Sequence, residues 1–485
     1  MVACLRLVRA DVAQRTTLRN TMCLNRSSPS LLRSGQRKHS HARDTILCVI
    51  AFTALCLFST SSCVARPAGI AGTGQSTVQG QSAQTVAPVV RYALPPEKLR
   101  QAVALARTGR RLYFAEFIWG LLVLLAILRT GLAAKFRDWA LGASRLRILQ
   151  AIIFCPLLLL TLDIANLPFR VWGHQILRSY NLSVQGWLSW ILDWMKAEGI
   201  TLALATVAGW VLYELIERSP RRWWMGAWVA AVLLVVAGAY AEPLIIEPLF
   251  YDYMPVAATH PELVRQVEKV VARANMTIPE DRILEMAASA KLNELNAYVS
   301  GIGSSKRVVF WDTTLARTNE AQALAVFGHE LGHYALNHVW KGIALTAVGL
   351  GISLPFLAWL YANVLRKWGS IWYAKAPQGW DSLAVLLLLV SALQFASTPI
   401  DNALSRYFEH QADLYCLEVI HGIVPDAPQV TAQVNQILGE ADLEEPDPSR
   451  LTVFWFYTHP PIGDRIAFAL QYDPWSQGRE PEFIH

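Results

Sequence analysis

Apolar segments long enough to cross a membrane constrain this chain more than any other feature. Of its 485 residues, 53% are hydrophobic and only 16% are charged, whereas about 25% are charged in an average soluble domain. A helix needs about 20 apolar residues to cross the hydrocarbon core of a bilayer. The predicted spans are residues 112–128, 148–167, 200–216, 223–241, 342–365 and 383–396, the last extending to Ile400. These runs predict a predominantly α-helical, polytopic membrane protein.

The first 90 residues have a different composition. A basic stretch precedes a short apolar run from Ile46 to Phe58, and small residues follow near Ala65. This pattern is typical of a signal peptide or a signal anchor, and residues 1–65 are assigned to this region. A retained anchor would raise the number of spans from six to seven. Residues 66–90, rich in Gly, Ser, Gln and Thr, are predicted to be a flexible linker.

Polar segments between the later spans predict a small α+β domain built from two parts of the chain. Residues 91–245 form the first membrane-helix region, and 246–341 the first part of the domain. Residues 342–400 supply two more membrane helices, and 401–485 complete the domain. In its first part, 261–276 is an amphipathic helix. Two strands, 296–300 and 306–312, are joined by a Gly-Ile-Gly-Ser-Ser turn.

The distribution of basic residues predicts the orientation of the chain in the membrane. Lys and Arg gather in loops 129–147, 217–222 and 366–380, so these loops are predicted to be cytoplasmic. The polar domain then lies on the other side, which in a bacterial inner membrane is the periplasm. The net charge of +6 is modest and no basic block alternates with aromatic residues, so nucleic-acid binding is not expected.

The segment from Val326 to His338 contains the pattern H-E-x-x-H. His329 and His333 are four residues apart, so on a helix both imidazoles face the same side and can bind one metal ion. Glu330 lies beside them, where a general base is needed. The alternative is two core histidines on a buried helix. Nine residues separate His338 from His329, so on a continuous helix it faces the opposite side, and we interpret it as structural.

Two flanking features of this helix are also predicted. Thr318 is expected to cap its N-terminus. Gly328 and Gly332 are poor helix formers, and we expect them to allow another backbone or a substrate to approach closely.

A catalytic zinc site needs a third protein ligand. Candidates follow the last span, because that segment returns to the side of His329. Glu409 and Asp413 are four residues apart on a predicted helix over 401–421, so one can bind metal while the other orients a histidine. From spacing alone, a solvated acidic face is the commoner explanation of this pair. His410 lies on a neighbouring face and is not predicted to be a ligand.

These motifs together resemble a known family. The H-E-L-G-H helix is followed by two apolar spans, then by S-R-x-x-E-x-Q-A-D at 405–413 and T-H-P-P-x-x-x-R at 458–465. This order is similar to that of the type I CAAX prenyl endopeptidases, which are integral-membrane zinc metalloproteases. The strand pair around 296–313 is similar as well, and the likeness extends over roughly residues 91–475.

The resemblance implies a zinc site and a mechanism. One Zn²⁺ would be bound by His329, His333 and Glu409. Glu330 would act as the general base and later as the proton donor. Asp413 would hydrogen-bond a zinc-binding histidine. The family fold is a ring of seven membrane helices around a large water-filled chamber.

The resemblance also implies roles for residues around the zinc site. His459 would hydrogen-bond the substrate carbonyl or its oxyanion, and Arg465 would support that segment. Arg406 would anchor the helix of the third ligand electrostatically. Asn296 and Tyr298 would lie on the strand that holds the peptide.

The expected function is therefore an integral-membrane endopeptidase that hydrolyses peptide bonds with a Glu-activated, zinc-bound water. Its substrate would be a peptide or protein, with lipidated and membrane-bound proteins among the candidates. Eukaryotic members act on prenylated proteins at the cytosolic side, whereas the charge pattern here predicts the opposite side. Quality control of non-prenylated proteins is thus an equal alternative to CAAX processing. A non-enzymatic scaffold or transporter with a structural metal site is a third.

Overall fold

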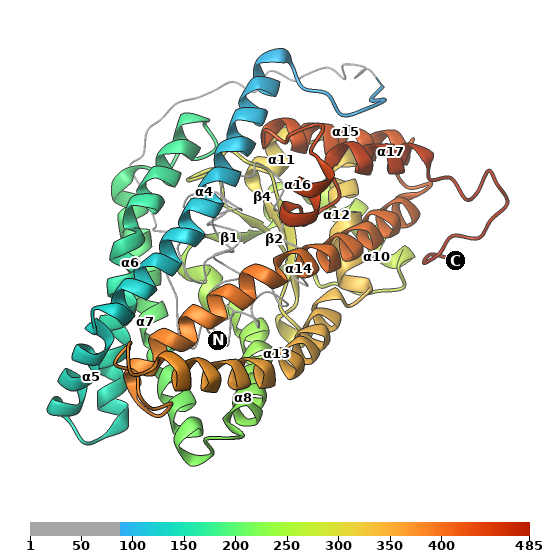
Figure 1. Cartoon of the computed structure of the whole chain (residues 1–485). Helices are drawn as coiled ribbons and strands as arrows, with labels where there is room; N and C mark the ends of the chain where they lie inside the picture. Colours follow the sequence, from blue (N-terminus) through green and yellow to red (C-terminus); the bar gives the residue numbers. More distant parts are fainter. Residues whose placement is uncertain (1–87) are drawn as a thin grey trace.

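Long helices arranged around a small sheet make up the protein, as the computed structural model shows for residues 88–485 (Figure 1). The predicted signal segment and nearly all of the predicted linker lie outside these residues. Within them, six helices are long and apolar enough to cross a membrane. They are α4 (Pro96–Arg129), α6 (Arg147–Ser179), α7 (Trp187–Arg218), α8 (Trp223–Ala241), α13 (His338–Trp368) and α14 (Leu383–Ile420).

Each predicted span lies within one of these helices, but the helices extend beyond the apolar runs. The polar residues from Pro96 to Arg111 and the first span form the single helix α4. The last span likewise continues into the predicted helix of Glu409, giving the 38-residue helix α14. A change from apolar to polar residues moves a helix out of the bilayer but does not end it, because ending it requires a breaking residue or a cap. The short helix α5 (Leu132–Ala143) lies between α4 and α6.

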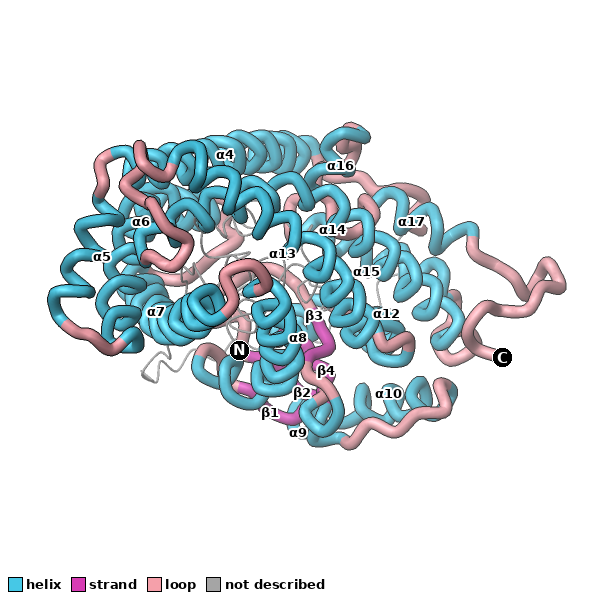
Figure 2. The backbone as a smooth tube through the Cα atoms, turned by 60° about the horizontal axis from the view of Figure 1, so that its bottom comes forward, coloured by secondary structure: helices cyan, strands magenta, loops and turns pink. Residues whose placement is uncertain are grey.

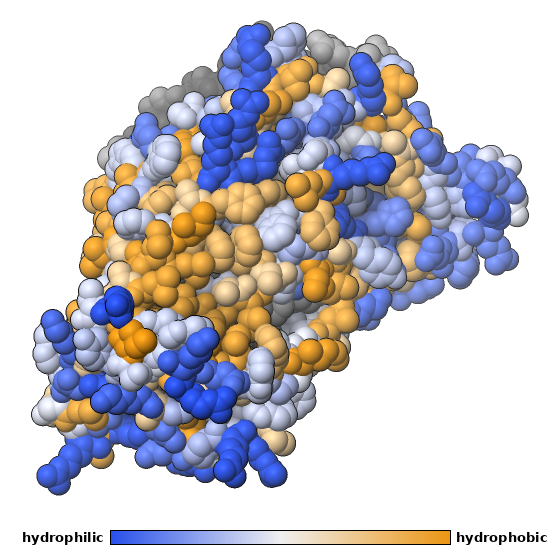
Figure 3. All heavy atoms as spheres, viewed as in Figure 1, coloured by the Kyte–Doolittle hydropathy of each residue, from blue (hydrophilic) through white to orange (hydrophobic). Residues whose placement is uncertain are grey.

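The surface of the helical part is apolar in a broad band. Figure 3 shows hydrophobic side chains over the middle of this face and hydrophilic side chains at both ends. Large exposed apolar side chains on the spans include Leu122, Ile164, Leu233 and Ile352. Apolar side chains that face outward along a span are expected where the surrounding medium is lipid.

A four-stranded sheet lies beside the membrane helices, with its strands gathered next to α12 (Figure 2). Its strands are β1 (Tyr253–Pro255), β2 (Ile283–Met286), β3 (Ala297–Ser300) and β4 (Arg307–Trp311), in the order β1-β2-β4-β3. The predicted pair is confirmed as the antiparallel strands β3 and β4. The strands β1 and β2 were not predicted. β1 has only three residues, and β2 pairs in parallel with β4, so no hairpin turn marks it in the sequence as one marks β3 and β4.

Short helices complete the polar domain. They are α9 (Val256–Thr259), α10 (Pro261–Arg273), α11 (Asp312–Arg317), α12 (Glu320–Ala335), α15 (Ala427–Ala441), α16 (Arg450–Phe456) and α17 (Ile462–Gln471). The predicted amphipathic helix is α10, whose valines pack in one core with α12 and α14. The two parts of the chain predicted to build the domain therefore share a hydrophobic core.

The N-terminus of α12 differs from the prediction by one residue. Asn319, not Thr318, caps the helix: its side-chain oxygen accepts from the backbone N–H of Gln322 at 2.9 Å. The Gln322 side chain accepts in turn from the backbone N–H of Asn319 at 3.0 Å. This reciprocal capping box satisfies two backbone donors, whereas a threonine cap at the preceding position would satisfy one. Thr318 instead donates its hydroxyl to the carbonyl of Thr314.

The two glycines of α12 permit a close contact with α14, as predicted. A Cβ atom on Gly332 would lie 3.0 Å from the Cα atom of Ala412 and 3.2 Å from its carbonyl oxygen. A Cβ atom on Gly328 would lie 3.0 Å from the side chain of Ile420. Because the atoms facing Gly332 belong to the backbone of α14, any side chain there must push the two helices apart.

We predict that Gly332→Ala destabilises the protein by about 1–3 kcal/mol, despite the better helix propensity of alanine, because it overpacks this contact. Thermal unfolding in detergent measures the effect. The matched control is Gly349→Ala on α13, where an added Cβ meets nothing within 4 Å. That variant should be neutral or slightly stabilised, and equal stability of the two variants would contradict the prediction.

Candidate active site

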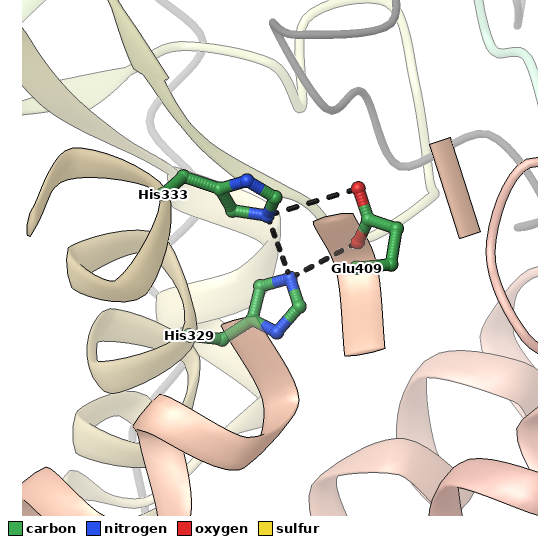
Figure 4. Close-up of side chains that lie close together, drawn as sticks. All are labelled: His329, His333 and Glu409. Atoms are coloured by element: carbon green, nitrogen blue, oxygen red, sulfur yellow. Dashed lines mark hydrogen bonds and ion pairs between the residues drawn. The ribbon is translucent and has the colours of Figure 1, made fainter. Parts of the chain in front are cut away.

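Three side chains from two helices converge at the contact between α12 and α14. His329 and His333 project from α12, and Glu409 projects from α14 and faces both imidazoles (Figure 4). The Nε2 atom of His329 lies 3.2 Å from Oε2 of Glu409, and that of His333 lies 3.7 Å from Oε1. The Glu409 side chain is completely buried. The structure thus brings together the three residues predicted as ligands.

The spacing of these atoms fits a metal ion. The two Nε2 atoms are 3.2 Å apart, close to the separation of about 3.3 Å expected for two nitrogens, each about 2.0 Å from one tetrahedral ion. A buried carboxylate facing two imidazoles is also unfavourable unless a cation compensates its charge. The donor set of two histidines and one glutamate suits zinc.

Asp413 fixes the first histidine from behind. Its Oδ1 atom lies 2.8 Å from Nδ1 of His329. The imidazole therefore donates through Nδ1, and the lone pair of Nε2 points toward Glu409. Arg465 holds Asp413 through two hydrogen bonds, from Nε at 2.8 Å and from Nη2 at 2.5 Å. Asp413 lies where its predicted role requires. Arg465 was predicted to support the segment of His459, and the structure shows that it hydrogen-bonds Asp413.

His338 holds His333, the second of the two histidines, by a hydrogen bond that the sequence pattern did not predict. Its Nε2 atom lies 3.3 Å from the side-chain oxygen of Gln411. That nitrogen therefore carries the proton, and Nδ1 of His338 accepts from Nδ1 of His333 at 2.9 Å. The lone pair of Nε2 on His333 is then free for a metal, as it is on His329.

The prediction that His338 faces away from the site is wrong, because it assumed one continuous helix. The helix α12 ends at Ala335, and Asn337 has a left-handed backbone with φ of 53°. This residue redirects the chain before α13 begins at His338. An asparagine shortly after a helix is a known signal for such a turn, and it was the available clue.

Glu330 and His459 line one small cavity together with His329 and Glu409. The cavity has a volume of about 40 Å³. Burial raises the pKa of Glu330 above its ordinary value. His459 lies with Nε2 2.9 Å from Oε2 of Glu409, and burial lowers its pKa to about 4. Near neutral pH, His459 is therefore an uncharged imidazole that can donate one hydrogen bond.

Arg406 connects the helix of Glu409 to the segment that carries His459. Its Nη1 atom donates to the carbonyl oxygens of Val453 at 3.1 Å and Tyr457 at 2.5 Å. These carbonyls lie in and just after α16, immediately before His459. The predicted anchoring by Arg406 thus takes the form of hydrogen bonds to the backbone.

The two residues predicted on the strand that holds the peptide lie in different surroundings, one in the cavity and one away from it. Asn296 immediately precedes β3 and lines the cavity. Tyr298 lies on β3, but its side chain is buried on the other face of the sheet, where its hydroxyl donates to Glu247 at 3.0 Å. Side chains alternate along a strand, so Tyr298 cannot face the side that Ala297 and Val299 face. His410 packs against Phe468 and takes no part in the cluster, as predicted.

Known proteins share both parts of this arrangement. The model of peptidase family M48 matches residues 257–473, and the model "CAAX prenyl protease N-terminal, five membrane helices" matches 77–252. An uncharacterized metalloprotease of Bacillus subtilis is 32% identical over 376 residues, covering 78% of this chain and 86% of that protein. CAAX prenyl protease 1 of Saccharomyces cerevisiae is 25% identical over 354 residues, covering 67% and 73%. The crystal structure of S. mikatae Ste24p has the same fold, with a TM-score of 0.65 at 20% identity over 78% of this chain and 89% of that one.

Fold, site and relatives define a multi-pass integral-membrane metalloprotease, whose spans form the membrane chamber of the Ste24p-like fold. The chain belongs to peptidase family M48. The predicted fold class and family resemblance are confirmed. Membership also implies a bound metal ion, a peptide or protein substrate, and contact with membrane lipid.

We predict that His338→Phe lowers metal affinity by about 10–100-fold, the usual effect of removing a hydrogen-bond partner behind a ligand histidine. Phenylalanine keeps the stacking of this ring on Phe408, whose centroid is 4.6 Å away. Competition with a chromophoric chelator measures the affinity. His410→Phe is the matched control, since His410 also packs on an aromatic ring but lies outside the cluster. Equal affinity of both variants would rule out the proposed role of His338.

Proposed function

We propose that this protein is a zinc-dependent endopeptidase in which His329, His333 and Glu409 hold the ion. The observation that carries the proposal is the convergence of their donor atoms beside a buried Glu330. Zinc at this position would polarise the scissile carbonyl and lower the pKa of water. Three protein ligands leave a fourth position open, as catalysis requires.

Glu330 is the proposed general base. It lines the cavity beside the ligands, so it can accept a proton from the attacking water and later donate it to the leaving amine. Its raised pKa favours this role, because a glutamate that ionises closer to neutral pH is a stronger base and a better subsequent acid. The burial that raises this pKa also keeps bulk water from competing with the attacking molecule.

His459 is the proposed donor to the oxyanion that develops on the scissile carbonyl. Both His459 and Glu409 line the cavity, and the Nε2 atom of His459 lies 2.9 Å from Oε2 of Glu409. Its Nδ1 atom lies 3.0 Å from the hydroxyl of Thr458. Arg406 fixes the approach of this segment through the carbonyl of Tyr457. A donor held in place before the reaction needs no reorganisation during it.

The proposed orientation places this site outside the cytoplasm, in the periplasm if the protein lies in a bacterial inner membrane. Supporting this, the basic loops after α4, α7 and α13 alternate consistently along the chain. A peptidase on that face would meet membrane-bound or misfolded proteins, prenylated or not. The edge strand β3, which runs beside α12, suits a peptide that binds by backbone pairing.

CAAX processing is the second candidate, and one observation favours it. Relatives from yeast, plants and mammals carry the name CAAX prenyl protease 1 or its homolog. The scaffold or transporter alternative has less support. It would use ionisable groups within the spans, yet the fully buried Asp163 and Arg170 pair with each other.

We predict that Glu330→Gln lowers kcat by about 10²–10⁴-fold, the usual contribution of a general base, while zinc binds nearly as well. Metal analysis of the purified protein and a fluorogenic peptide assay measure the two quantities. Glu320→Gln is the control, because Glu320 is exposed at the start of the same helix. Turnover by Glu330→Gln at the rate of the control would refute the mechanism.

A second prediction concerns the substrate. An outward-facing protease of broad scope should not depend on the prenyl group. It should therefore cleave a prenylated peptide and its unprenylated counterpart with kcat/KM values within about tenfold of each other, a ratio that corresponds to about 1.4 kcal/mol of discrimination. Mass spectrometry of the products identifies the cleaved bond in each. Cleavage of the prenylated peptide alone would instead establish CAAX-type processing and contradict the proposed orientation.

A further inference from the structure

The cavity beside the metal-binding cluster has a second wall that the catalytic proposal does not use. This wall is the inner face of α15, where Val434, Asn435 and Leu438 line the cavity opposite His329 and Glu330. This cavity of about 40 Å³ also receives the proposed metal ion and attacking water. A side chain that shares the space with them must be small.

One atom in this wall is a buried acceptor without a donor in the described part of the chain, and the hydroxyl of Thr431, which also lines the cavity, does not donate to it. Asn435 is 3% exposed, and its Nδ2 atom donates to the carbonyl of Thr431 at 2.9 Å. Its Oδ1 atom accepts no hydrogen bond from any group in residues 88–485. The neighbouring Val434 and Leu438 offer no side-chain donor. A buried amide oxygen in such a place is unfavourable unless a ligand supplies the donor.

Contacts on the outer face of α15 hold this wall in place. The side chain of Gln429 accepts from the backbone N–H of Val89 at 3.2 Å and donates to its carbonyl at 2.9 Å. Gln436 makes the same pair of hydrogen bonds with Ala93, at 3.2 and 2.6 Å. These two glutamines are seven residues apart, so they lie on one side of the helix. The wall therefore cannot retreat easily to admit a larger side chain.

We propose that this cavity binds the substrate side chain next to the scissile bond and that Asn435 selects serine or threonine there. The inference rests on the proposed peptidase function and extends it to substrate choice. Serine and threonine have small side chains, and their hydroxyl groups can donate to Oδ1 of Asn435. Valine has the shape of threonine but leaves that oxygen without a donor.

The test compares peptides that differ at one position only. Matched fluorogenic peptides carry threonine or valine, and serine or alanine, on either side of the cleaved bond. The wild type should favour the hydroxyl-bearing member by about tenfold in kcat/KM at one of the two positions, the value of one net hydrogen bond. Binding of the same peptides to zinc-loaded Glu330→Gln, measured by fluorescence anisotropy, should show a similar preference without any turnover.

The variant Asn435→Leu keeps the approximate size of the side chain and removes its oxygen. The ratio of its kcat/KM for the threonine peptide to its kcat/KM for the valine peptide should fall to about one or below. Gln433→Leu is the control on the same helix, since Gln433 does not line the cavity, and its ratio should match the wild type. No threonine preference in the wild type at either position, or an unchanged preference in Asn435→Leu, would overturn the inference. If Glu330→Gln cleaved the peptides as fast as the wild type, the proposed function itself would fail instead.

Discussion

The contact between α12 and α14 at Gly332 is the constraint on which the site depends. The two backbones approach so closely that a methyl group would not fit without displacement. Only this proximity allows the carboxylate of Glu409 to reach two imidazoles on the facing helix. Because α14 continues unbroken from a membrane span, the same contact couples the position of the third ligand to the packing of the membrane helices.

Hydrogen bonds behind the ligands determine which of their atoms face the centre. Each histidine is held at Nδ1, His329 by Asp413 and His333 by His338. Arg465 and Gln411 complete the two chains of hydrogen bonds. Such buried networks are favourable only when their members are paired, since the loss of one member leaves another unsatisfied in a low-dielectric interior. The two chains differ in charge: one ends in an ion pair and the other in a neutral amide.

The cavity between α12 and α15 combines the catalytic groups with a wall of mixed character. Val434 and Leu438 lie in that wall beside the hydroxyl of Thr431 and the amide oxygen of Asn435. Sites of this composition bind through shape and use a few polar atoms for selectivity. The edge position of β3 beside α12 offers the backbone pairing that would hold a peptide across the cavity. Selectivity and catalysis thus depend on different elements around one small volume.

The sequence by itself determined the class of fold and most of the chemistry of the site. Apolar runs predicted all six spans within residues 88–485, because burial in lipid requires a minimum length that composition reveals. The spacing of His329 and His333 predicted a shared face, because both lie on one regular helix. Glu409 could be chosen over a solvated acidic face only through the resemblance of several motifs to one family. Local pattern did not reveal β1, which is too short, or β2, which no hairpin turn joins to its partners.

Tertiary structure alone decided how distant segments meet. The ion pair between Arg465 and Asp413, the burial of Tyr298 on the far face of the sheet, and the approach of Asn435 to the cavity all join parts of the chain that no periodicity relates. The position of His338 was predicted wrongly, because the left-handed backbone of Asn337 redirects the chain. Periodicity predicts which residues share a face of one element. The partner of that face depends on packing between elements, and packing is a property of the whole fold.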